Sequence, residues 1–394
     1  MKICLMNHFS DKMHPQLQSQ GYEVVSENQC DLASSEIEAI LLRSKNLHNL
    51  SLPKGLLAVA RAGAGVNNIP VERMSEQGIA VFNAPGANAN AVAEMVLTAI
   101  LMQVRHVKPA LEFTGRLDAL SENLAQQVES EKAQFQGREL QGLKLGIIGL
   151  GAIGVLLANK AVALGMKVFG FDPHISVENA WRLSSEVIHK SSLTALLNDC
   201  EALSIHVPYM EATHHLLNQE KLALLPAGSF VLNFSRDEVV DRQAVLSALE
   251  KEQLSAYITD FPESALLQHD KVMCFPHLGA STKEAQENAS TQVIHSLDAF
   301  LKRGEIRYSV NLPELPAGEI PNGCSRLLVI HQNRVGMIAQ ITDCIEEAEE
   351  NIIEMNNRSR EALAVTLIDL QSDKNQELLS EIESLEAVLS VRYC

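Results

Sequence analysis

Over residues 1–82, short apolar runs alternate with longer stretches that are compatible with helices. Each run is too short for a helix and is bounded by turn-forming residues, which is typical of a buried strand. The predicted strands are residues 2–6, 23–25, 39–42, 57–60 and 80–82. Strands that alternate with helices in this way predict a parallel α/β sheet. The stretch that follows, residues 91–102, is apolar on nearly all sides and predicts a buried helix.

The alternation resumes after a polar, helix-prone connector at residues 111–141. Further strands are predicted at residues 143–148, 167–171, 202–207, 229–234, 256–259 and 272–274, with helices at 155–164 and 283–302. The pattern therefore predicts a second parallel sheet, so that the chain carries two Rossmann-like, doubly wound α/β domains.

Three glycines between the strand at 143–148 and the next helix have the spacing of a dinucleotide-binding loop. Gly149 allows a tight turn, Gly151 lets the backbone approach a pyrophosphate, and Gly154 lets helix and strand pack closely. Asp172 ends the next strand, where a carboxylate binds a ribose hydroxyl and repels a 2′-phosphate. None of the three residues after it is an arginine. The loop therefore predicts NAD rather than NADP as the cofactor.

Residues 311–323 contain three prolines and two glycines, a composition that resists helix and strand and indicates a domain boundary. Beyond them the predicted order is βαββαβ, with elements at residues 326–331, 337–349, 352–358, 363–370, 376–384 and 388–393. This order predicts a ferredoxin-like sandwich. We expect a substrate-binding domain at 1–89 completed by 283–312, a NAD-binding domain at 90–282, a linker at 313–324 and a C-terminal domain at 325–394.

Composition and charge exclude several classes of protein. The chain is 46% apolar and 21% charged, and its formal net charge of −17 argues against nucleic acids and anionic membranes as partners. No apolar run reaches the ~18 residues of a membrane span. The cysteines are odd in number, scattered and never in CxxC spacing, which predicts reduced thiols of a cytoplasmic protein and no metal site; they are Cys4, Cys30, Cys200, Cys274, Cys324, Cys344 and Cys394.

Polar residues with complementary chemistry follow three of the later predicted strands. Arg236 follows one strand, Asp260 and Glu263 follow the next, and His277 follows the third. Open α/β sheets place their sites at such strand ends. Hydride transfer from a 2-hydroxy acid needs a base for the hydroxyl proton, a cation for the carboxylate and a carboxylate that orients the base. Taken singly, each residue also fits an ordinary structural role, so the combination carries the interpretation.

At these residues the chain resembles the D-isomer-specific 2-hydroxyacid dehydrogenases. The segment from Ala84 to Glu94 is similar to the family's NAPxxN…VAE sequence, Asn233-Phe-Ser-Arg236 to its NxxR strand end, and Pro276-His277-Leu-Gly-Ala-Ser-Thr to its PHxGxST sequence. The resemblance covers nearly the whole chain. It implies an NAD-dependent oxidoreductase, and the C-terminal unit resembles the ACT domain of the members that act on 3-phosphoglycerate.

The resemblance implies a role for each matching residue. Arg236 would bind the substrate carboxylate, Glu263 would orient His277, and His277 would move the hydroxyl proton. Asp260 would contact the nicotinamide amide. The cofactor set would be Gly149, Gly151, Ala152, Ile153, Gly154, Asp172, His206, Val207, Pro208, Thr213, Asn233, Ser235, Asp260, His277 and Gly279. The substrate set would be Arg43, Ser44, Lys45, Arg61, Ala62, Gly63, Ala64, Gly65, Asn88 and Lys132.

Two departures from the family pattern bear on these roles. Asp237 stands where the family usually has glycine, and aspartate tolerates unusual backbone conformations better than most residues. Glu263 lies only three residues after Asp260, so Glu284 and Glu287 are alternatives for the orienting carboxylate.

In the C-terminal unit, His331, Asn333 and Asn351 match the residue types that hold L-serine in serine-sensing ACT domains. The resemblance implies feedback by serine on the first step of serine synthesis, in a homodimer or homotetramer. Three alternatives stay open. The unit could serve only as a dimerisation surface, the substrate could be glycerate or hydroxypyruvate, or the chain could be a catalytically silent, NAD-sensing scaffold.

Overall fold

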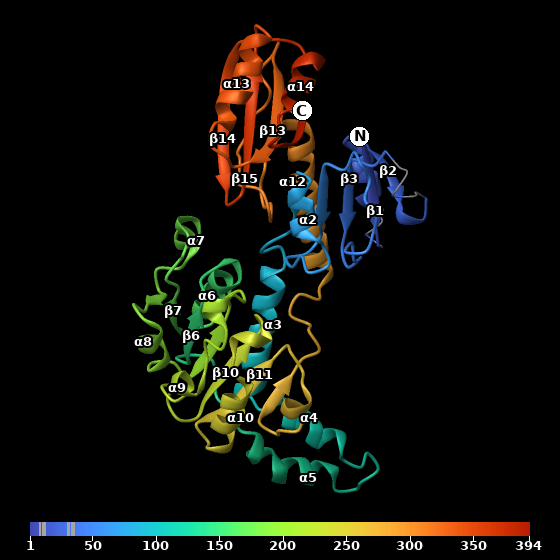
Figure 1. The fold of residues 1–394 in the computed structure, drawn as a ribbon. Coiled ribbons are helices and arrows are strands. Elements are labelled where there is room, and N and C mark those ends of the chain that lie inside the picture. Colours follow the sequence, from blue (N-terminus) through green and yellow to red (C-terminus); the bar gives the residue numbers. More distant parts are fainter. Residues whose placement is uncertain (8, 10–12, 30–31, 33–35) are drawn as a thin grey trace. The chain divides into compact units, whose positions relative to one another are not determined.

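The computed structural model describes residues 1–7, 9, 13–29, 32 and 36–394 (Figure 1). Cys30, which is predicted to be a free thiol, lies outside the described residues. The chain forms two compact units, residues 1–88 with 286–394, and residues 89–285. The domain boundaries expected from the sequence fall close to these limits, 90 against 89 and 282 against 285, and stay predictions.

The first unit contains a five-stranded parallel sheet with the order β2-β1-β3-β4-β5. Its strands are β1 (Lys2–Met6), β2 (Glu23–Ser26), β3 (Ala39–Leu42), β4 (Ala58–Arg61) and β5 (Ala80–Phe82), joined by η1 (Glu27–Gln29) and the helices α1 (Met13–Ser19) and α2 (Val71–Glu76). Alternate residues of β1 enter different cores, Ile3 on one face and Cys4 on the other. Most of α12 (Lys283–Arg303) belongs to this unit, and its apolar residues pack on the Ile3 side.

The second unit is a seven-stranded parallel sheet with the order β12-β11-β10-β9-β6-β7-β8. Its strands are β6 (Lys144–Ile148), β7 (Lys167–Phe171), β8 (Ile188–His189), β9 (Ala202–Ile205), β10 (Ser229–Asn233), β11 (Leu254–Thr259) and β12 (Val272–Cys274). The chain moves outward from β6 in one direction and then returns to β9 on its other side. This reversal is the place where doubly wound sheets bind their ligands.

The second unit also contains the helices that cover both faces of its sheet, together with two exposed helices at residues 107–115 and 124–131 that bury no side chain. They are α3 (Ala89–Val104), α4 (Val107–Gly115), α5 (Leu124–Glu131), α6 (Ala152–Ala163), α7 (Val177–Arg182), α8 (Leu193–Leu197), α9 (Gln219–Leu222), α10 (Arg242–Glu250) and α11 (Ser264–Leu267), with η2 (Lys132–Phe135), η3 (Glu211–Thr213) and η4 (Asp237–Val239). Side chains of α3 and α6 fill the core on one face, and those of α8, α9 and α10 fill the core on the other.

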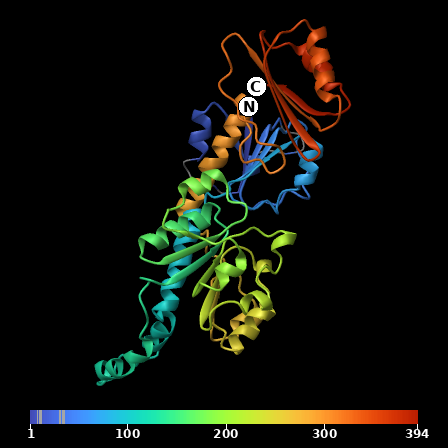
Figure 2. The same cartoon turned by 90° about the vertical axis from the view of Figure 1, so that its left-hand side faces the viewer.

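The C-terminal domain, residues 325–394, has an antiparallel sheet with the order β14-β15-β13-β16. Its elements are β13 (Ser325–Gln332), α13 (Met337–Glu347), β14 (Ile352–Arg360), β15 (Leu363–Leu370), α14 (Gln376–Glu383) and β16 (Val388–Tyr393). Both helices pack on the same face of this sheet (Figure 2). The predicted fold class, with two doubly wound sheets followed by a βαββαβ unit, is confirmed.

The other face of the C-terminal sheet packs against the rest of the first unit. Leu328 and Leu367 share a core with Phe300 of α12 and with Leu312 and Leu315. The last two residues lie in or next to the predicted linker, and both are fully buried. Ile306 also forms an antiparallel backbone bridge with Leu315. The proline-rich segment is therefore packed onto the unit along part of its length.

Two arginines of the C-terminal domain bond the end of α12. Arg392 donates to the carbonyls of Phe300 and Leu301, and Arg326 donates to the carbonyl of Arg303 at 3.2 Å. The last carbonyls of a helix have no partners within the helix, and cations are favourable near them. Arg326 is itself buried and bidentate with Asp369, at 2.6 and 2.7 Å. The C-terminal domain therefore supplies the cap of α12.

A substitution at Gly304, which follows α12, tests how tightly the C-terminal sheet packs against this residue. Its φ is +69°, and a Cβ there would lie 2.6 Å from Cδ1 of Leu367. We expect Gly304→Ala to lower the free energy of unfolding by ~1–2 kcal/mol more than a glycine with the same backbone but open surroundings. Gly323→Ala is the matched control, with φ of +74° and no neighbour within 4 Å. Urea denaturation measures the free energy of unfolding of both variants. Equal losses of stability would show that Leu367 can move away from the added methyl group without destabilising the protein.

Candidate active site

The register of three parallel strands gathers the predicted catalytic residues at one edge of the second sheet. Asn233 of β10 pairs with Thr259 of β11, and Thr259 pairs with Cys274 of β12. The three strands therefore end side by side. Because parallel strands have their carboxyl ends at the same edge, the turns that carry Arg236, Glu263 and His277 all leave the sheet there.

Asn233 builds the turn that carries Arg236. Its buried side chain donates to the carbonyl of Arg236 at 2.9 Å and accepts from the backbone and hydroxyl of Ser235, at 3.1 and 3.0 Å. The side chain of Arg236 is exposed and donates one hydrogen bond to the carbonyl of Ser235 at 2.6 Å. A guanidinium has five N–H donors, so it can still bind a carboxylate through two of them.

Asp260 holds the turn that carries His277. The carboxylate of Asp260 is buried and accepts from the backbone N–H groups of Leu278 and Gly279, at 2.7 and 2.8 Å. His277 has a φ of +55°, in the left-handed region that costs most residues free energy. The two charge-assisted bonds stabilise that backbone. Contact of Asp260 with nicotinamide stays a prediction.

Glu263 forms an ion pair with Arg242, the first residue of α10. Arg242 also pairs with Asp237 at 2.8 Å. Among the described residues of this unit, no hydrogen bond joins Glu263 to His277, whose ring contacts Phe261 edge-on with 5.4 Å between centroids. Glu284 and Glu287 lie at the start of α12. The choice of Glu263 as the carboxylate that orients His277 therefore stays a prediction.

The glycine loop between β6 and α6 has the geometry that a dinucleotide requires. A Cβ on Gly149 would lie 2.6 Å from the carbonyl of His206, and one on Gly154 would lie 1.9 Å from the carbonyl of Gly149. Gly151, at the amino end of α6, faces open space. The loop thus packs tightly at two glycines and leaves its backbone open at the third, and a helix amino terminus attracts a pyrophosphate. Ala152 and Ile153 form the first turn of α6.

Asp172 lies at the end of β7, beside this loop. Its carboxylate accepts from the backbone N–H groups of Leu150 and His174, both at 2.8 Å. Each carboxylate oxygen can accept a further hydrogen bond, so a ribose hydroxyl fits here.

The segment after β9 completes this side of the sheet. His206 pairs through Nε2 with the hydroxyl of Ser204 at 2.8 Å, and its Nδ1 is buried without a hydrogen-bond partner among the described residues. Burial lowers the pKa of His206 to about 3, so the ring is neutral near pH 7. Val207 lies against Gly149, and Thr213 closes the next turn by donating to the carbonyl of Pro208 at 2.7 Å.

The first unit contains a cavity of about 460 Å³ lined by Asn7, Arg43, Ser44, Arg61 and Ala62. Asn7 shapes it, since its side-chain oxygen accepts from the backbone N–H groups of Arg43, Ser44 and Lys45, at 3.3, 3.0 and 2.8 Å. Four predicted substrate residues, Arg43, Ser44, Arg61 and Ala62, therefore line one cavity, with the loop from Gly63 to Gly65 following them in the chain.

Several predicted substrate residues already have side-chain partners within the protein. Arg61 donates to the carbonyls of Arg43, at 2.8 Å, and Gly65, and burial lowers its pKa. The ammonium group of Lys45 pairs with Glu27. Asn88 is the last residue of the first unit before α3. Lys132 belongs to the second unit, where it is exposed and pairs with Glu129.

The predicted effector residues all have internal partners. His331 lies within β13, is buried, and pairs with the carbonyl of Gln332 and the hydroxyl of Thr366, both at 2.9 Å. Burial lowers its pKa. The side chain of Asn333 donates to the carbonyl of Glu361 at 3.1 Å, and that of Asn351 donates to Gln371 at 3.0 Å.

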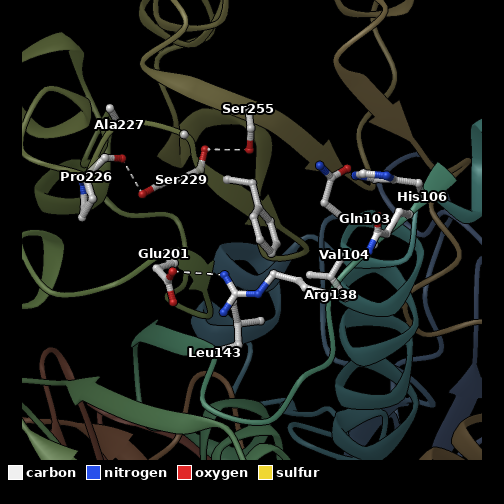
Figure 3. A pocket seen from close by; sticks show the side chains of 14 residues that line it. Gln103, Val104, His106, Arg138, Leu143, Glu201, Pro226, Ala227, Ser229 and Ser255 are labelled. Atoms are coloured by element: carbon white, nitrogen blue, oxygen red, sulfur yellow. Dashed lines mark hydrogen bonds and ion pairs between the residues drawn. The ribbon is translucent and has the colours of Figure 1, made fainter. Parts of the chain in front are cut away.

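A second cavity, of about 550 Å³, lies at the opposite edge of the second sheet, where the strands begin (Figure 3). Glu201 and Arg138 form an ion pair across it at 3.1 Å, and the hydroxyls of Ser229 and Ser255 donate to nearby carbonyls. The ion pair and the two hydroxyls thus have partners within the protein, and the side chains of Gln103, His106 and Gln136 also line the cavity.

Sequence reasoning did not identify Asn7 or Arg242. Asn7 directly follows β1 and has a φ of +75°, so an asparagine at a strand end was a usable signal. Arg242 had no such signal. In the described part of the chain there is no cluster of residues suited to a metal ion, and no helix is long and apolar enough to cross a membrane.

Comparison with known proteins agrees with this geometry. Residues 107–279 match the family model for the NAD-binding domain of D-isomer specific 2-hydroxyacid dehydrogenases. The D-3-phosphoglycerate dehydrogenase of Haemophilus influenzae is 32% identical over 348 residues, which cover 86% of this chain and 81% of that protein.

Two solved structures share the fold. D-mandelate dehydrogenase of Rhodotorula graminis has a TM-score of 0.67 at 24% identity, over 80% of this chain and 98% of that one. The NAD⁺-bound 3-phosphoglycerate dehydrogenase of Entamoeba histolytica has a TM-score of 0.60 at 24% identity, over 80% and 99%. Because the similarity to the Haemophilus protein extends over most of both sequences, this chain belongs to the D-isomer specific 2-hydroxyacid dehydrogenase family and is an NAD-dependent enzyme.

Proposed function

We propose that the protein oxidises D-3-phosphoglycerate to 3-phosphohydroxypyruvate, and catalyses the reverse reaction, as the first step of serine biosynthesis. The observation that carries the proposal is the cavity of the first unit, where Arg43 and Ser44 lie on a loop that Asn7 holds through three backbone hydrogen bonds. A guanidinium cation beside a hydroxyl donor suits a phosphate group. The name of the Haemophilus influenzae relative supports the same substrate.

The proposed chemistry takes place at the carboxyl ends of β10, β11 and β12 in the second unit. Arg236 binds the substrate carboxylate, and His277 takes the proton of the C2 hydroxyl, or returns it to the carbonyl in reduction. NAD supplies the acceptor for the hydride that leaves C2. Glu263 orients the imidazole and stabilises its protonated form, while Asp260 fixes the backbone of His277. The glycine loop and Asp172 hold the cofactor.

One observation favours a second candidate substrate. Lys45, the other predicted phosphate ligand, is paired with Glu27, which offsets its charge. A site with fewer available cations suits an unphosphorylated substrate such as glycerate or hydroxypyruvate. The two candidates differ in how far turnover depends on Arg43.

We also propose a cytoplasmic location and a homodimeric or homotetrameric assembly. None of the cysteines in the described residues forms a disulfide, which agrees with a reducing compartment. The strands β14 and β16 are the edges of the C-terminal sheet, and exposed edge strands can pair with another chain.

Replacement of the catalytic residues tests the reaction. We expect His277→Ala to lower kcat by ~10²–10⁴, the range for a positioned proton-transfer group, with NADH affinity nearly unchanged. Arg236→Lys should also lose most of its turnover, because an ammonium group cannot bind a carboxylate through two parallel bonds. His189→Ala, at an exposed position in β8, is the control. Steady-state assays and NADH fluorescence titration measure these effects, and normal turnover in either variant would remove that residue from the mechanism.

The substrate is tested by Arg43→Ala. We expect its KM for phosphohydroxypyruvate to rise at least ~10-fold, or about 1.4 kcal/mol, and its KM for hydroxypyruvate to change much less. Lys45→Ala should have a smaller effect, because Glu27 already offsets that charge. NADH-coupled assays with both substrates decide the matter. Parallel losses on the two substrates would mean that Arg43 has a structural role and does not bind the phosphate.

We further propose that L-serine inhibits the enzyme through the C-terminal domain, acting as an ACT domain. Asn333 and Asn351 lie outside the sheet core, where their amides can exchange internal partners for a ligand. His331 is less accessible, because Thr366 and Gln332 occupy both ring nitrogens.

L-serine should inhibit without competing with phosphohydroxypyruvate, with a coupling of about 1–3 kcal/mol between the two sites. Asn351→Ala should abolish inhibition and leave turnover intact. Calorimetry and inhibition kinetics measure binding and coupling separately. Absence of both would leave the domain as an assembly module or as a sensor for another ligand.

A further inference from the structure

The carboxylate assigned to orient His277 is held by another residue. Arg242 pairs through the same nitrogen, Nη2, with Glu263 and with Asp237, the latter at 2.8 Å. It is the first residue of α10, whose amino end is fixed because the side chain of Asp241 accepts from the backbone N–H of Ala244 at 3.1 Å. A guanidinium on a capped helix therefore bridges two carboxylates.

Those two carboxylates belong to different catalytic turns. Asp237 directly follows Arg236 after β10, and Glu263 follows Asp260 after β11. All three charged side chains are partly buried, with relative exposures of 33% for Arg242, 29% for Asp237 and 40% for Glu263. The bridge therefore ties the turn of the carboxylate-binding arginine to the turn of the orienting carboxylate.

We propose that Arg242 is a positioning residue that sets how strongly Glu263 acts on His277, by dividing its own charge between Glu263 and Asp237. The proposal rests on the proposed roles of Glu263 and His277. While Arg242 holds Glu263, the negative charge that would stabilise the imidazolium is partly compensated. Asp237 counteracts this effect, since it draws the guanidinium toward itself. The aspartate that replaces the family's glycine thus becomes part of the catalytic arrangement.

Other charged and titratable groups surround this cluster in the described part of the unit. Asp260 lies beside His277, and its carboxylate accepts from two backbone N–H groups. Arg236 belongs to the turn after β10. The thiol of Cys274 in β12 bonds to the backbone of Glu263, and Lys108 in α4 interacts with that thiol. These groups are the same in all the variants proposed below, so differences among the variants report on Arg242, Asp237 and Glu263.

The sign of each effect follows from the charges. Arg242→Gln removes the competing cation, so Glu263 stabilises the imidazolium and the pKa of His277 rises. Asp237→Asn removes the competing carboxylate, so Arg242 pairs with Glu263 alone and the pKa of His277 falls. Arg242→Lys keeps the charge and should leave the pKa near that of the wild type. Opposite shifts from two partners of one ion pair are not expected from a purely structural role.

The test is NMR titration of the His277 ring in the full-length protein, assigned by comparison with His277→Ala. We expect a rise of at least ~0.5 pH unit in Arg242→Gln and a fall of similar size in Asp237→Asn. Arg138→Gln, which breaks an ion pair at the opposite edge of the sheet, is the matched control and should not shift the titration. The pH profile of kcat/KM, measured with phosphohydroxypyruvate or hydroxypyruvate, should move in the same directions.

Shifts of the same sign in the two variants, or a loss of stability or kcat without any shift, would overturn the proposal. If Arg242→Gln does not fold, Asp237→Asn still tests it, because an unchanged or raised pKa there contradicts it. The titration needs no substrate. An inactive protein with the expected shifts would therefore count against the proposed function alone.

Discussion

The parallel register of β10, β11 and β12 is the constraint on which the catalytic arrangement depends. The pairings of Asn233 with Thr259 and of Thr259 with Cys274 bring the three strand ends together. A shift of one residue would turn every side chain of a strand to the opposite face and break both cores, so the register is strongly specified. Residues 27 and 41 positions apart in the sequence, Arg236 with Glu263 and His277, thereby leave the sheet at one edge.

Around this edge, the side chains that build the site are not the ones assigned to catalysis. Asn233 and Asp260 are buried, and most of their hydrogen bonds go to backbone groups of the turns that present Arg236 and His277. Buried polar groups of this kind are stabilising only when their partners are in place. Such turns keep their shape before any ligand arrives, and preorganised groups need little rearrangement during the reaction. Arg242 adds ion pairs with Asp237 and Glu263 to these backbone contacts.

The C-terminal domain is integrated into the first unit rather than attached to it by a free tether. Alternate residues of β13 face its own helices, as Leu327 does, or the core shared with α12, as Leu328 does. The buried pair of Arg326 and Asp369 fixes this contact, and removal of one partner of such a pair typically costs ~3–5 kcal/mol. A ligand on this domain would therefore act on a unit that already shares its core with the cavity-bearing sheet.

The sequence by itself determined the strands other than the short β8, the glycine loop and the order of the catalytic turns, because apolar periodicity and glycine conformation are local properties. Tertiary structure alone decided which side chains meet. Asn7 accepts hydrogen bonds from residues 43–45, Glu27 pairs with Lys45, and Arg242 pairs with Glu263. Each contact joins segments that are distant in the chain. Burial of His331 followed from β13 being an inner strand with both faces covered, which strand order decides. Charge pairing and strand order depend on the assembled fold, and no short stretch of sequence carries that information.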